Sequence, residues 1–249
     1  MGRSKLTIIA VASFVLSALV LSQPVKADDS GLIVSAAAEK KFNKKTSTAL
    51  EAELRTRNDF RTVDRIGVSL SWQYKINSWL KADAGYQLLI DNNPEKLTDK
   101  IDGTYNHWRP SYWATRHRAF ASLTATYKIR RVSLSLCERY RMTYRPMHTT
   151  CRYDFDDEAW ETTDVKKKTK HVLRSRFKVD WNIPASKFSP WASFELFNSM
   201  SLDKWRLQTG IDYSLTKKHS FELYYRYQNV RDDEETNTHY LGLGYKFKF

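Results

Sequence analysis

The chain has 249 residues, which by length alone allows one or two domains. Its 41 lysines and arginines outnumber its 28 aspartates and glutamates, so the formal net charge is +13, and its mean hydropathy is −0.60. Apart from residues 6–21, no stretch is apolar enough for a transmembrane helix, which excludes a membrane protein built of several such helices. The low hydropathy does not exclude a membrane β-barrel, because only alternate residues of each strand face lipid.

The chain begins with the pattern of a secretory signal peptide. Arg3 and Lys5 form a short positive region, an apolar run follows, and Val25-Lys26-Ala27 has small residues at the two positions that a signal peptidase reads. We expect residues 1–27 to be removed and the mature protein to start near Asp28, the alternative being a single membrane anchor. Export from the cytosol argues against nucleic acid as the partner of this basic chain.

Segments in which apolar and polar residues alternate follow one another through the rest of the chain, and this period of two predicts β-strands. We expect strands at residues 31–42, 46–57, 62–75, 79–91, 113–129, 131–144, 169–182, 188–198, 204–215, 219–229 and 238–249. Short connections alternate strictly with longer polar ones, among them residues 92–112 and 145–168, as periplasmic turns alternate with external loops in outer-membrane barrels. The prediction for residues 28–249 is an all-β fold, a transmembrane antiparallel up-and-down β-barrel.

The number of predicted strands is odd, whereas bacterial single-chain barrels have an even number. Either the segment 31–42 does not join the wall in the usual way, which leaves ten strands, or one strand is missing from the prediction, which makes twelve. We therefore expect ten to twelve strands. A soluble two-layer β-sandwich is the alternative fold, although its strands are usually shorter.

The final predicted strand has one apolar face and ends on an aromatic residue. Its apolar face consists of Leu241, Leu243, Tyr245, Phe247 and Phe249. Because the strand follows an external loop, we expect the C-terminus on the periplasmic side, with Tyr245, Phe247 and Phe249 as the signal to the barrel assembly machinery. This pattern predicts residence in the outer membrane of a diderm bacterium, in contact with membrane lipids and lipopolysaccharide.

Aromatic residues beside the short turns predict an interfacial girdle on the lipid-facing wall. Its members are Trp72, Tyr74, Trp79, Tyr127, Trp181, Trp191, Tyr213 and Tyr245, and Trp113, Tyr140, Trp205 and Tyr227 suggest a second girdle. Glu138 fits this wall badly, because it is in phase with the apolar residues of its strand. A carboxylate facing lipid is costly, so we expect Glu138 to lie near the outer interface or a bulge to reset the phase.

Short motifs are spread over essentially the whole mature chain. They are Glu39-Lys40-Lys41, the run from Leu50 to Arg57, Asp64-Arg65, Trp108-Arg109-Pro110, Arg116-His117-Arg118, Glu138-Arg139-Tyr140, Leu173-Arg174-Ser175-Arg176 and Tyr224-Tyr225-Arg226-Tyr227-Gln228. Together they resemble the family known as domain of unknown function 2490. The resemblance implies a secreted outer-membrane β-barrel, and it implies no chemistry, since the family has no assigned activity.

Charged residues at the inward-facing positions are the candidate functional residues. They are Glu51, Glu53, Arg55, Arg57, Arg65, Arg116, Arg118, Arg139, Arg141, Arg174, Arg176, Glu195, Arg206, Glu222 and Arg226. In a barrel of ten to twelve strands, such side chains can pair across the lumen as a structural network that closes the barrel. They can equally line a small porin-like channel, in which an excess of arginine favours small anionic solutes. Both interpretations stay open here.

An enzyme that modifies membrane lipid or lipopolysaccharide at the external rim is the third alternative. His239, with Asp232 and Asp233 nearby in the sequence, has the residue types of a general base. No serine stands in a nucleophile motif such as Gly-x-Ser-x-Gly. We therefore predict no enzyme and no catalytic residue.

Metal sites and disulfides are only weakly indicated. The acidic runs 154–158 and 232–235 lack the spacing of a recognised calcium loop, so we expect solvated hairpin tips and predict neither metal nor cofactor. Cys137 and Cys151 could form a disulfide in an oxidising compartment, and the sequence leaves open whether they pair or stay free.

Overall fold

The computed structural model describes residues 28–231 and 236–249 of the chain. The predicted signal peptide at residues 1–27 and the predicted rim carboxylates Asp232 and Asp233 lie outside the described residues. Within the described part of the chain, no helix is long and apolar enough to cross a membrane.

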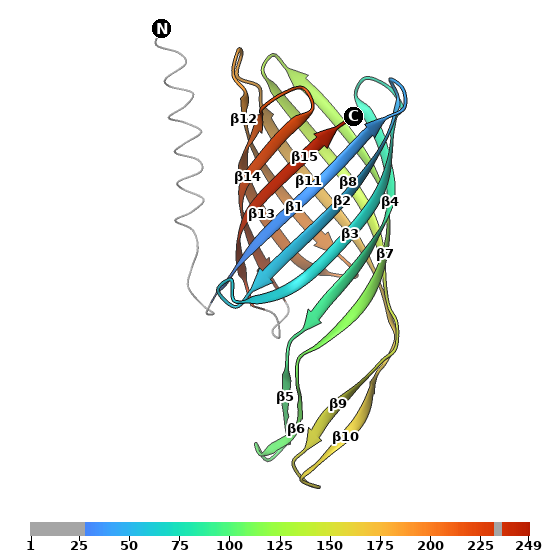
Figure 1. The fold of residues 1–249 in the computed structure, drawn as a ribbon, viewed down its shortest axis with the longest axis vertical. Coiled ribbons are helices and arrows are strands. Elements are labelled where there is room, and N and C mark those ends of the chain that lie inside the picture. The colour runs from blue at the N-terminus through green and yellow to red at the C-terminus, as the bar shows by residue number, and fades with distance from the viewer. Residues whose placement is uncertain (1–27, 232–235) are drawn as a thin grey trace.

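Eleven strands form one closed barrel (Figure 1). They are β1 Asp29–Lys41, β2 Thr46–Arg57, β3 Thr62–Lys75, β4 Leu80–Asn93, β7 Tyr112–Ile129, β8 Val132–Arg145, β11 Lys168–Trp181, β12 Phe188–Asn198, β13 Leu202–Ser214, β14 His219–Val230 and β15 Thr238–Lys248. Consecutive strands of this set pair antiparallel, so the predicted up-and-down barrel is confirmed.

The barrel closes through a parallel pair. β1 lies beside β15 with Asp29 opposite Thr238 and Glu39 opposite Lys248. An odd number of up-and-down strands brings the first and the last strand together in the same direction, and odd barrels of this kind exist. The expectation of an even number was therefore wrong, because β1 joins the wall and the eleven described strands already close the barrel.

Two of the long loops fold into a second sheet beyond one end of the barrel (Figure 1). It contains β5 Lys96–Asp99, β6 Tyr105–Arg109, β9 His148–Asp154 and β10 Ala159–Val165. Between the hairpins β5–β6 and β9–β10, His107 lies opposite Asp154 and Trp108 opposite Tyr153, and the Phe155 N–H donates to the carbonyl of Asn106. We call this sheet the extension. It was not predicted, because β5 and β6 are only four and five residues long, too short for a clear alternation.

The C-terminus lies at the end of the barrel opposite the extension (Figure 1). The turn between β1 and β2 lies at the same end as the C-terminus, and the long loops that build the extension lie at the other. This is the relative arrangement that the sequence predicts. Which end faces the periplasm remains a prediction.

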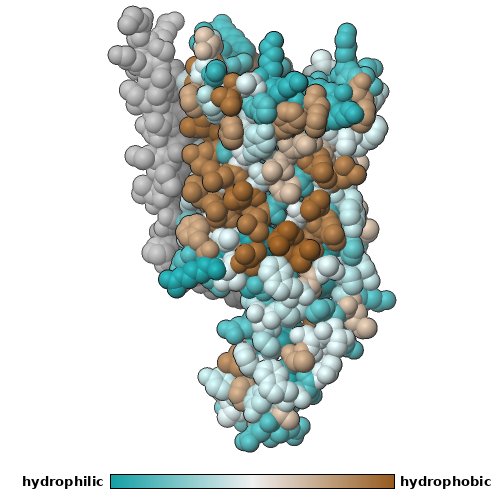
Figure 2. Space-filling model, viewed as in Figure 1, coloured by the Kyte–Doolittle hydropathy of each residue, from teal (hydrophilic) through white to brown (hydrophobic). Residues whose placement is uncertain are grey.

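The outer wall of the barrel exposes apolar side chains, whereas polar side chains gather at the end of the barrel opposite the extension and on the extension itself (Figure 2). Leu70 and Leu123 are about half exposed, at 54% and 52%. On β15 the outward Leu241 and Leu243 are 45% and 44% exposed, as the alternation predicted. An apolar surface of this kind requires lipid rather than water as its solvent.

Two predictions for the wall were wrong. Trp191 does not join the girdle: it is 7% exposed inside the barrel, where it has space because Gly210 is its cross-strand neighbour. Glu138 is not reoriented by a bulge, since β8 keeps its register with both neighbours, and it sits in the middle of β8 rather than at an end. Its Oε2 accepts a hydrogen bond of 2.7 Å from Ser175 Oγ, which partly offsets the cost of a carboxylate at this depth.

The two cysteines do not pair. Cys137 is buried on β8 and Cys151 is exposed on β9, and both are free thiols. Of the two alternatives, the structure therefore has the unpaired one.

Candidate functional site

The candidate site is the set of inward-facing charged residues, which the strand register brings side by side. Every second residue of each strand points into the lumen, so residues opposite one another on adjacent strands are neighbours there. Glu195 of β12, for example, lies opposite Arg176 of β11 and Arg206 of β13. The alternation of the sequence thus positions arginines around a few carboxylates.

Glu195 is shared by two arginines. Its Oε1 lies 3.2 Å from Arg174 Nη1, and its Oε2 lies 3.6 Å from Arg206 Nη1. Glu195 is 2% exposed, and the two arginine side chains are 8% and 12% exposed. One buried carboxylate therefore balances two buried guanidiniums, and the group keeps a net positive charge.

Asp91 is shared in the same way. It accepts hydrogen bonds from Arg65, and Arg116 Nε lies 2.9 Å from its Oδ2. Asp91 is 4% exposed. The sequence analysis missed it, because the predicted strand ended there, whereas β4 continues to Asn93 and keeps the carboxylate in the lumen.

Two further arginines have one carboxylate each. Arg55 Nη2 lies 2.8 Å from Glu53 Oε1, and Arg139 Nη2 lies 2.8 Å from Asp83 Oδ2. Of the remaining candidates, Arg57 lies 4.0 Å from Asp64. Among the described residues, Glu51 and Glu222 take part in no ion pair within 4.0 Å.

Four inward arginines have no carboxylate within 4.0 Å in the part of the chain that the structure describes: Arg118, Arg141, Arg176 and Arg226. Arg118 donates to Thr143 Oγ1 at 3.0 Å and to Gln87 Oε1 at 3.4 Å, both neutral acceptors. Arg226 likewise donates to Gln208 Oε1 at 3.1 Å. A buried charge without a countercharge is costly unless water or an ion compensates it.

Three of the four unpaired arginines, Arg118, Arg141 and Arg226, belong to one cluster. The guanidiniums of Arg141 and Arg206 stack on the same ring, that of Phe197, and Arg206 shares Glu195 with Arg174. We define the arginine cluster as Arg55, Arg118, Arg141, Arg174, Arg206 and Arg226. Glu53 and Glu195 are the carboxylates paired with its members. Within this cluster six guanidiniums face two paired carboxylates, so the cluster carries an excess of positive charge.

Aromatic rings fill the space between the charged groups, and the sequence analysis missed them. Phe197 is 2% exposed, and the guanidinium carbons of Arg206 and Arg141 lie 4.5 and 5.2 Å from its ring centroid. Phe120 and Arg139 make the same contact at 4.4 Å. Such stacking lets a guanidinium keep its charge where water is scarce.

Ile33, Trp191, Tyr224 and Tyr240 form a buried apolar cluster inside the barrel. In the sequence, this cluster could be recognised by glycines at inward positions that lie opposite aromatic residues on the next strand. A side chain at Gly242 would overlap the ring of Tyr224, so the glycine is what lets this ring lie flat on the wall. The lumen is therefore narrowed by rings as well as by ion pairs.

The predicted rim base lies outside the lumen. His239 Nδ1 is 2.5 Å from Tyr225 Oη, and its Nε2 is 2.9 Å from Asp28 Oδ2. Its cross-strand partner is Tyr227, and both neighbours on β15 are buried in the barrel, so the imidazole faces outward. Asp232 and Asp233 lie outside the described residues. Both ring nitrogens of His239 thus have a partner: Nδ1 contacts Tyr225 on the outer wall, and Nε2 contacts Asp28.

The acidic run 154–158 forms the hairpin tip that the sequence predicts. Asp154 Oδ1 accepts hydrogen bonds from the backbone N–H groups of Asp156, at 2.8 Å, and Asp157, at 3.3 Å. These two bonds hold the pKa of Asp154 below its ordinary value, and the bond from Asp156 has the larger effect. The carboxylate acts here as a turn-forming group.

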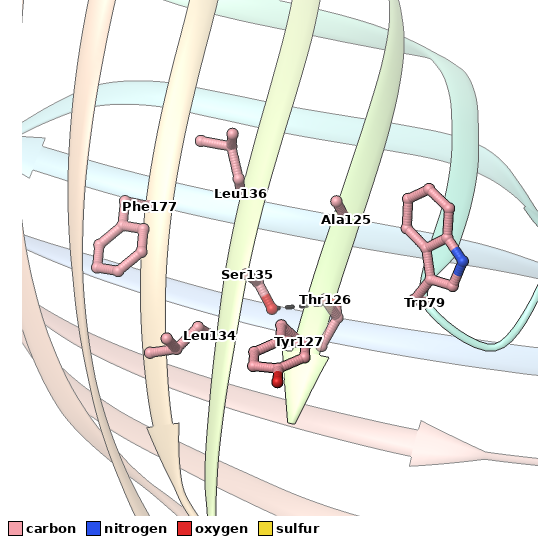
Figure 3. Close-up of a pocket in the computed structure, with 8 residues that line it drawn as sticks. All are labelled: Trp79, Ala125, Thr126, Tyr127, Leu134, Ser135, Leu136 and Phe177. Carbon is pink, nitrogen blue, oxygen red and sulfur yellow. Dashed lines mark hydrogen bonds between the residues drawn. The ribbon is translucent and has the colours of Figure 1, made fainter. Parts of the chain in front are cut away.

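An apolar hollow on the outer wall is not part of the site. Trp79, Tyr127, Leu136 and Phe177 surround it, and Ala125 leaves the space between them (Figure 3). These side chains are about half exposed or more on the lipid-facing side. Its lining is mainly apolar, like the rest of the outer wall, and Thr126 and Ser135 are its polar members.

The comparisons with known proteins agree with the fold. The family model described as protein of unknown function, DUF2490, matches residues 31–247. No curated protein matches. Among solved structures, the β-domain of the Bordetella autotransporter Brka is 13% identical with a TM-score of 0.56, covering 82% of this chain and 82% of that one. The NanC porin is 13% identical with a TM-score of 0.49, covering 90% of this chain and all of that one. At such identity the likeness to the Brka domain shows a shared barrel fold.

Proposed function

The chain belongs to the DUF2490 family of proteins of unknown function, and from that premise we propose that this outer-membrane β-barrel is a narrow channel preferring small anionic solutes. The observation that carries the proposal is the arginine cluster, whose guanidiniums outnumber the carboxylates paired with them. Rings of arginine and lysine favour anions in channels. A barrel of this size has room for a narrow path and for no wide pore.

The cost of burying arginine supports a lumen that water and anions reach. Arg141 and Arg118 lack a carboxylate partner among the described residues, and a dry interior would leave their charges uncompensated. The guanidinium group binds carboxylate or phosphate oxygens in a two-pronged geometry, which suits it to transient contacts with an anionic solute.

A structural barrel closed by its lumen network is the second candidate, and specific observations favour it too. The shared carboxylates Glu195 and Asp91 are almost completely buried, and Ile33 is 0% exposed within the barrel. A lumen packed to this degree holds its shape without conducting. The two candidates differ in one measurable property, the passage of ions.

We infer no catalytic step. The outward position of His239 between Tyr225 and Asp28 supports an interfacial role rather than that of a base. An enzyme acting on lipid or lipopolysaccharide would be revealed by turnover of those substrates that is lost in His239→Ala.

We place the extension outside the cell and Tyr245, Phe247 and Phe249 at the periplasmic end. The support is that long loops are external and short turns periplasmic in barrels of known orientation. Membrane lipid, lipopolysaccharide and the barrel assembly machinery are then the expected partners. A protease added to intact cells would cut the extension and spare the short turns.

Chloride entry into proteoliposomes tests the channel. Vesicles that contain a chloride-sensitive dye should fill faster with the protein than without it, and slower when Arg118 and Arg141 are both replaced by glutamine. Lys217→Gln, in the turn between β13 and β14, is the matched control and should leave the rate unchanged. Chloride entry no faster than in empty vesicles would favour the closed structural barrel.

A further inference from the structure

The two faces of the extension differ in chemistry. On one face the rings of Trp108 and Tyr153 pack against Trp160, each with ring centroids 5.6 Å apart. Since side chains alternate along a strand, the residues next to these rings point to the opposite face. That face collects His107, Arg152, Asp154 and Glu161, from the strands β6, β9 and β10.

Three donor groups of this face converge on one point. His107 Nε2 lies 3.1 Å from Asp154 Oδ2 and 3.7 Å from Glu161 Oε1, and the three donor atoms all lie within 4.8 Å of one another. We propose that His107, Asp154 and Glu161 form a binding site for a divalent transition-metal ion of the Zn²⁺ type. The site lies on the extension and shares no residue with the lumen, so it stands apart from the proposed channel.

The distances suit such an ion. A tetrahedral zinc ion with bonds of about 2.0–2.1 Å holds its donor atoms roughly 3.3 Å apart. The two distances from His107 Nε2, 3.1 and 3.7 Å, fall on either side of that value. One imidazole with two carboxylates is a donor set for zinc and related metals, whereas calcium takes oxygen ligands alone. Three protein ligands leave the fourth position of the ion to water or a solute.

Asp154 is already oriented for this role. Its Oδ1 is engaged by the backbone N–H groups of Asp156 and Asp157, which leaves Oδ2 directed at the imidazole. A ligand held by such outer contacts loses little freedom when it binds a metal. The His107 and Asp154 side chains are also largely shielded from solvent, at 21% and 18% exposure.

Arg152 is the group that competes with the ion. Its Nε donates to Glu161 Oε1, the same oxygen that faces His107. A bound ion must therefore take this oxygen from Arg152 or use the other carboxylate oxygen. Removing the guanidinium should strengthen metal binding, which gives the proposal a second and opposite readout.

The site would join the two hairpins of the extension. His107 belongs to β5–β6, whereas Asp154 and Glu161 belong to β9–β10, and the backbones of the hairpins pair over a short stretch, at His107–Asp154, Trp108–Tyr153 and the hydrogen bond from Phe155 to Asn106. An ion held by both hairpins adds a cross-link where the sheet is weakest. Metal binding should therefore rigidify the extension and leave the barrel unchanged.

Calorimetric titration of the metal-stripped full-length protein in detergent micelles with Zn²⁺ tests the proposal. We expect one ion per chain, at least about tenfold weaker binding in His107→Gln and in Asp154→Asn, and tighter binding in Arg152→Gln. His148→Gln is the matched control, because this histidine stacks on Tyr112 at 5.1 Å outside the cluster, and it should bind as the unmodified protein does. Unchanged heat-modifiable mobility of the barrel would show that each variant is folded.

Three results would overturn the proposal. They are the absence of a saturable Zn²⁺ site in the unmodified protein, binding that survives both His107→Gln and Asp154→Asn, and Ca²⁺ binding in place of Zn²⁺ that depends on Asp156 and Asp157 rather than on His107. Slower protease cleavage of the extension on addition of Zn²⁺, absent in His107→Gln, would support the cross-link directly.

Discussion

Replacing Glu195 by glutamine removes the carboxylate that pairs with both Arg174 and Arg206 while leaving the volume of the side chain nearly unchanged. The two ion pairs measure 3.2 and 3.6 Å, and the three side chains are 3%, 8% and 12% exposed. The amide oxygen can still accept one hydrogen bond. The perturbation is therefore the loss of one negative charge from a buried group of three.

The magnitude follows from the burial. At these separations and an effective dielectric constant of 20, the attraction of each pair is about 5 kcal/mol before desolvation is subtracted. Removing one partner of a buried pair costs about 3–5 kcal/mol in practice, because the remaining charge stays buried and uncompensated. We expect Glu195→Gln to lower the free energy of unfolding by about 3–5 kcal/mol. The same change leaves one more uncompensated positive charge in the arginine cluster and should increase anion preference.

Urea unfolding followed by tryptophan fluorescence in lipid vesicles measures this difference. Glu51→Gln is the control, since Glu51 also points inward but has no ion-pair partner within 4.0 Å among the described residues, and we expect a change below about 0.5 kcal/mol. A loss below about 1 kcal/mol in Glu195→Gln would refute the reasoning, because it would mean that water already screens this pair.

Two further predictions concern residues that line the wall. Gly242→Val should destabilise the barrel by about 1–3 kcal/mol in the same assay, because the new side chain displaces the ring of Tyr224, whereas Gly244→Ala, which meets Glu222 at 3.2 Å, should cost less. Equal effects of the two would contradict the packing of Tyr224 against the wall. Glu138→Leu combined with Ser175→Ala should stabilise the protein in vesicles by about 1–2 kcal/mol, because the pair is replaced by apolar groups that suit lipid. A destabilised double variant would mean that Glu138 has a partner outside the barrel wall.

The wall of the barrel could be predicted from the sequence because alternation reports both of its faces. The segment 219–229 corresponds to β14 at His219–Val230, and the segment 62–75 to β3 at Thr62–Lys75. Lipid on one side and a polar lumen on the other make every second residue apolar. The alternation therefore predicts where the strands lie and that the arginines point inward.

The remaining features depend on contacts that alternation does not record. Aromatic residues suit lipid and lumen alike, so Trp191 and Tyr224 could be placed inside only by noticing the glycines opposite them. Glu138 kept its phase against the expected energetic cost, because Ser175 is its partner across the strand pair. The sharing of Glu195 between Arg174 and Arg206 depends on the register of three strands, which no single strand encodes.

The reversal potential of purified protein in a planar bilayer tests the central claim most directly. Under a roughly tenfold KCl gradient, we predict current steps whose reversal potential is displaced from zero toward the equilibrium potential of chloride. In Arg141→Glu, which places a carboxylate in the arginine cluster, the reversal potential should shift toward the equilibrium potential of potassium. A reversal potential on the potassium side in the unmodified protein, or no conductance, would contradict a channel that prefers anions.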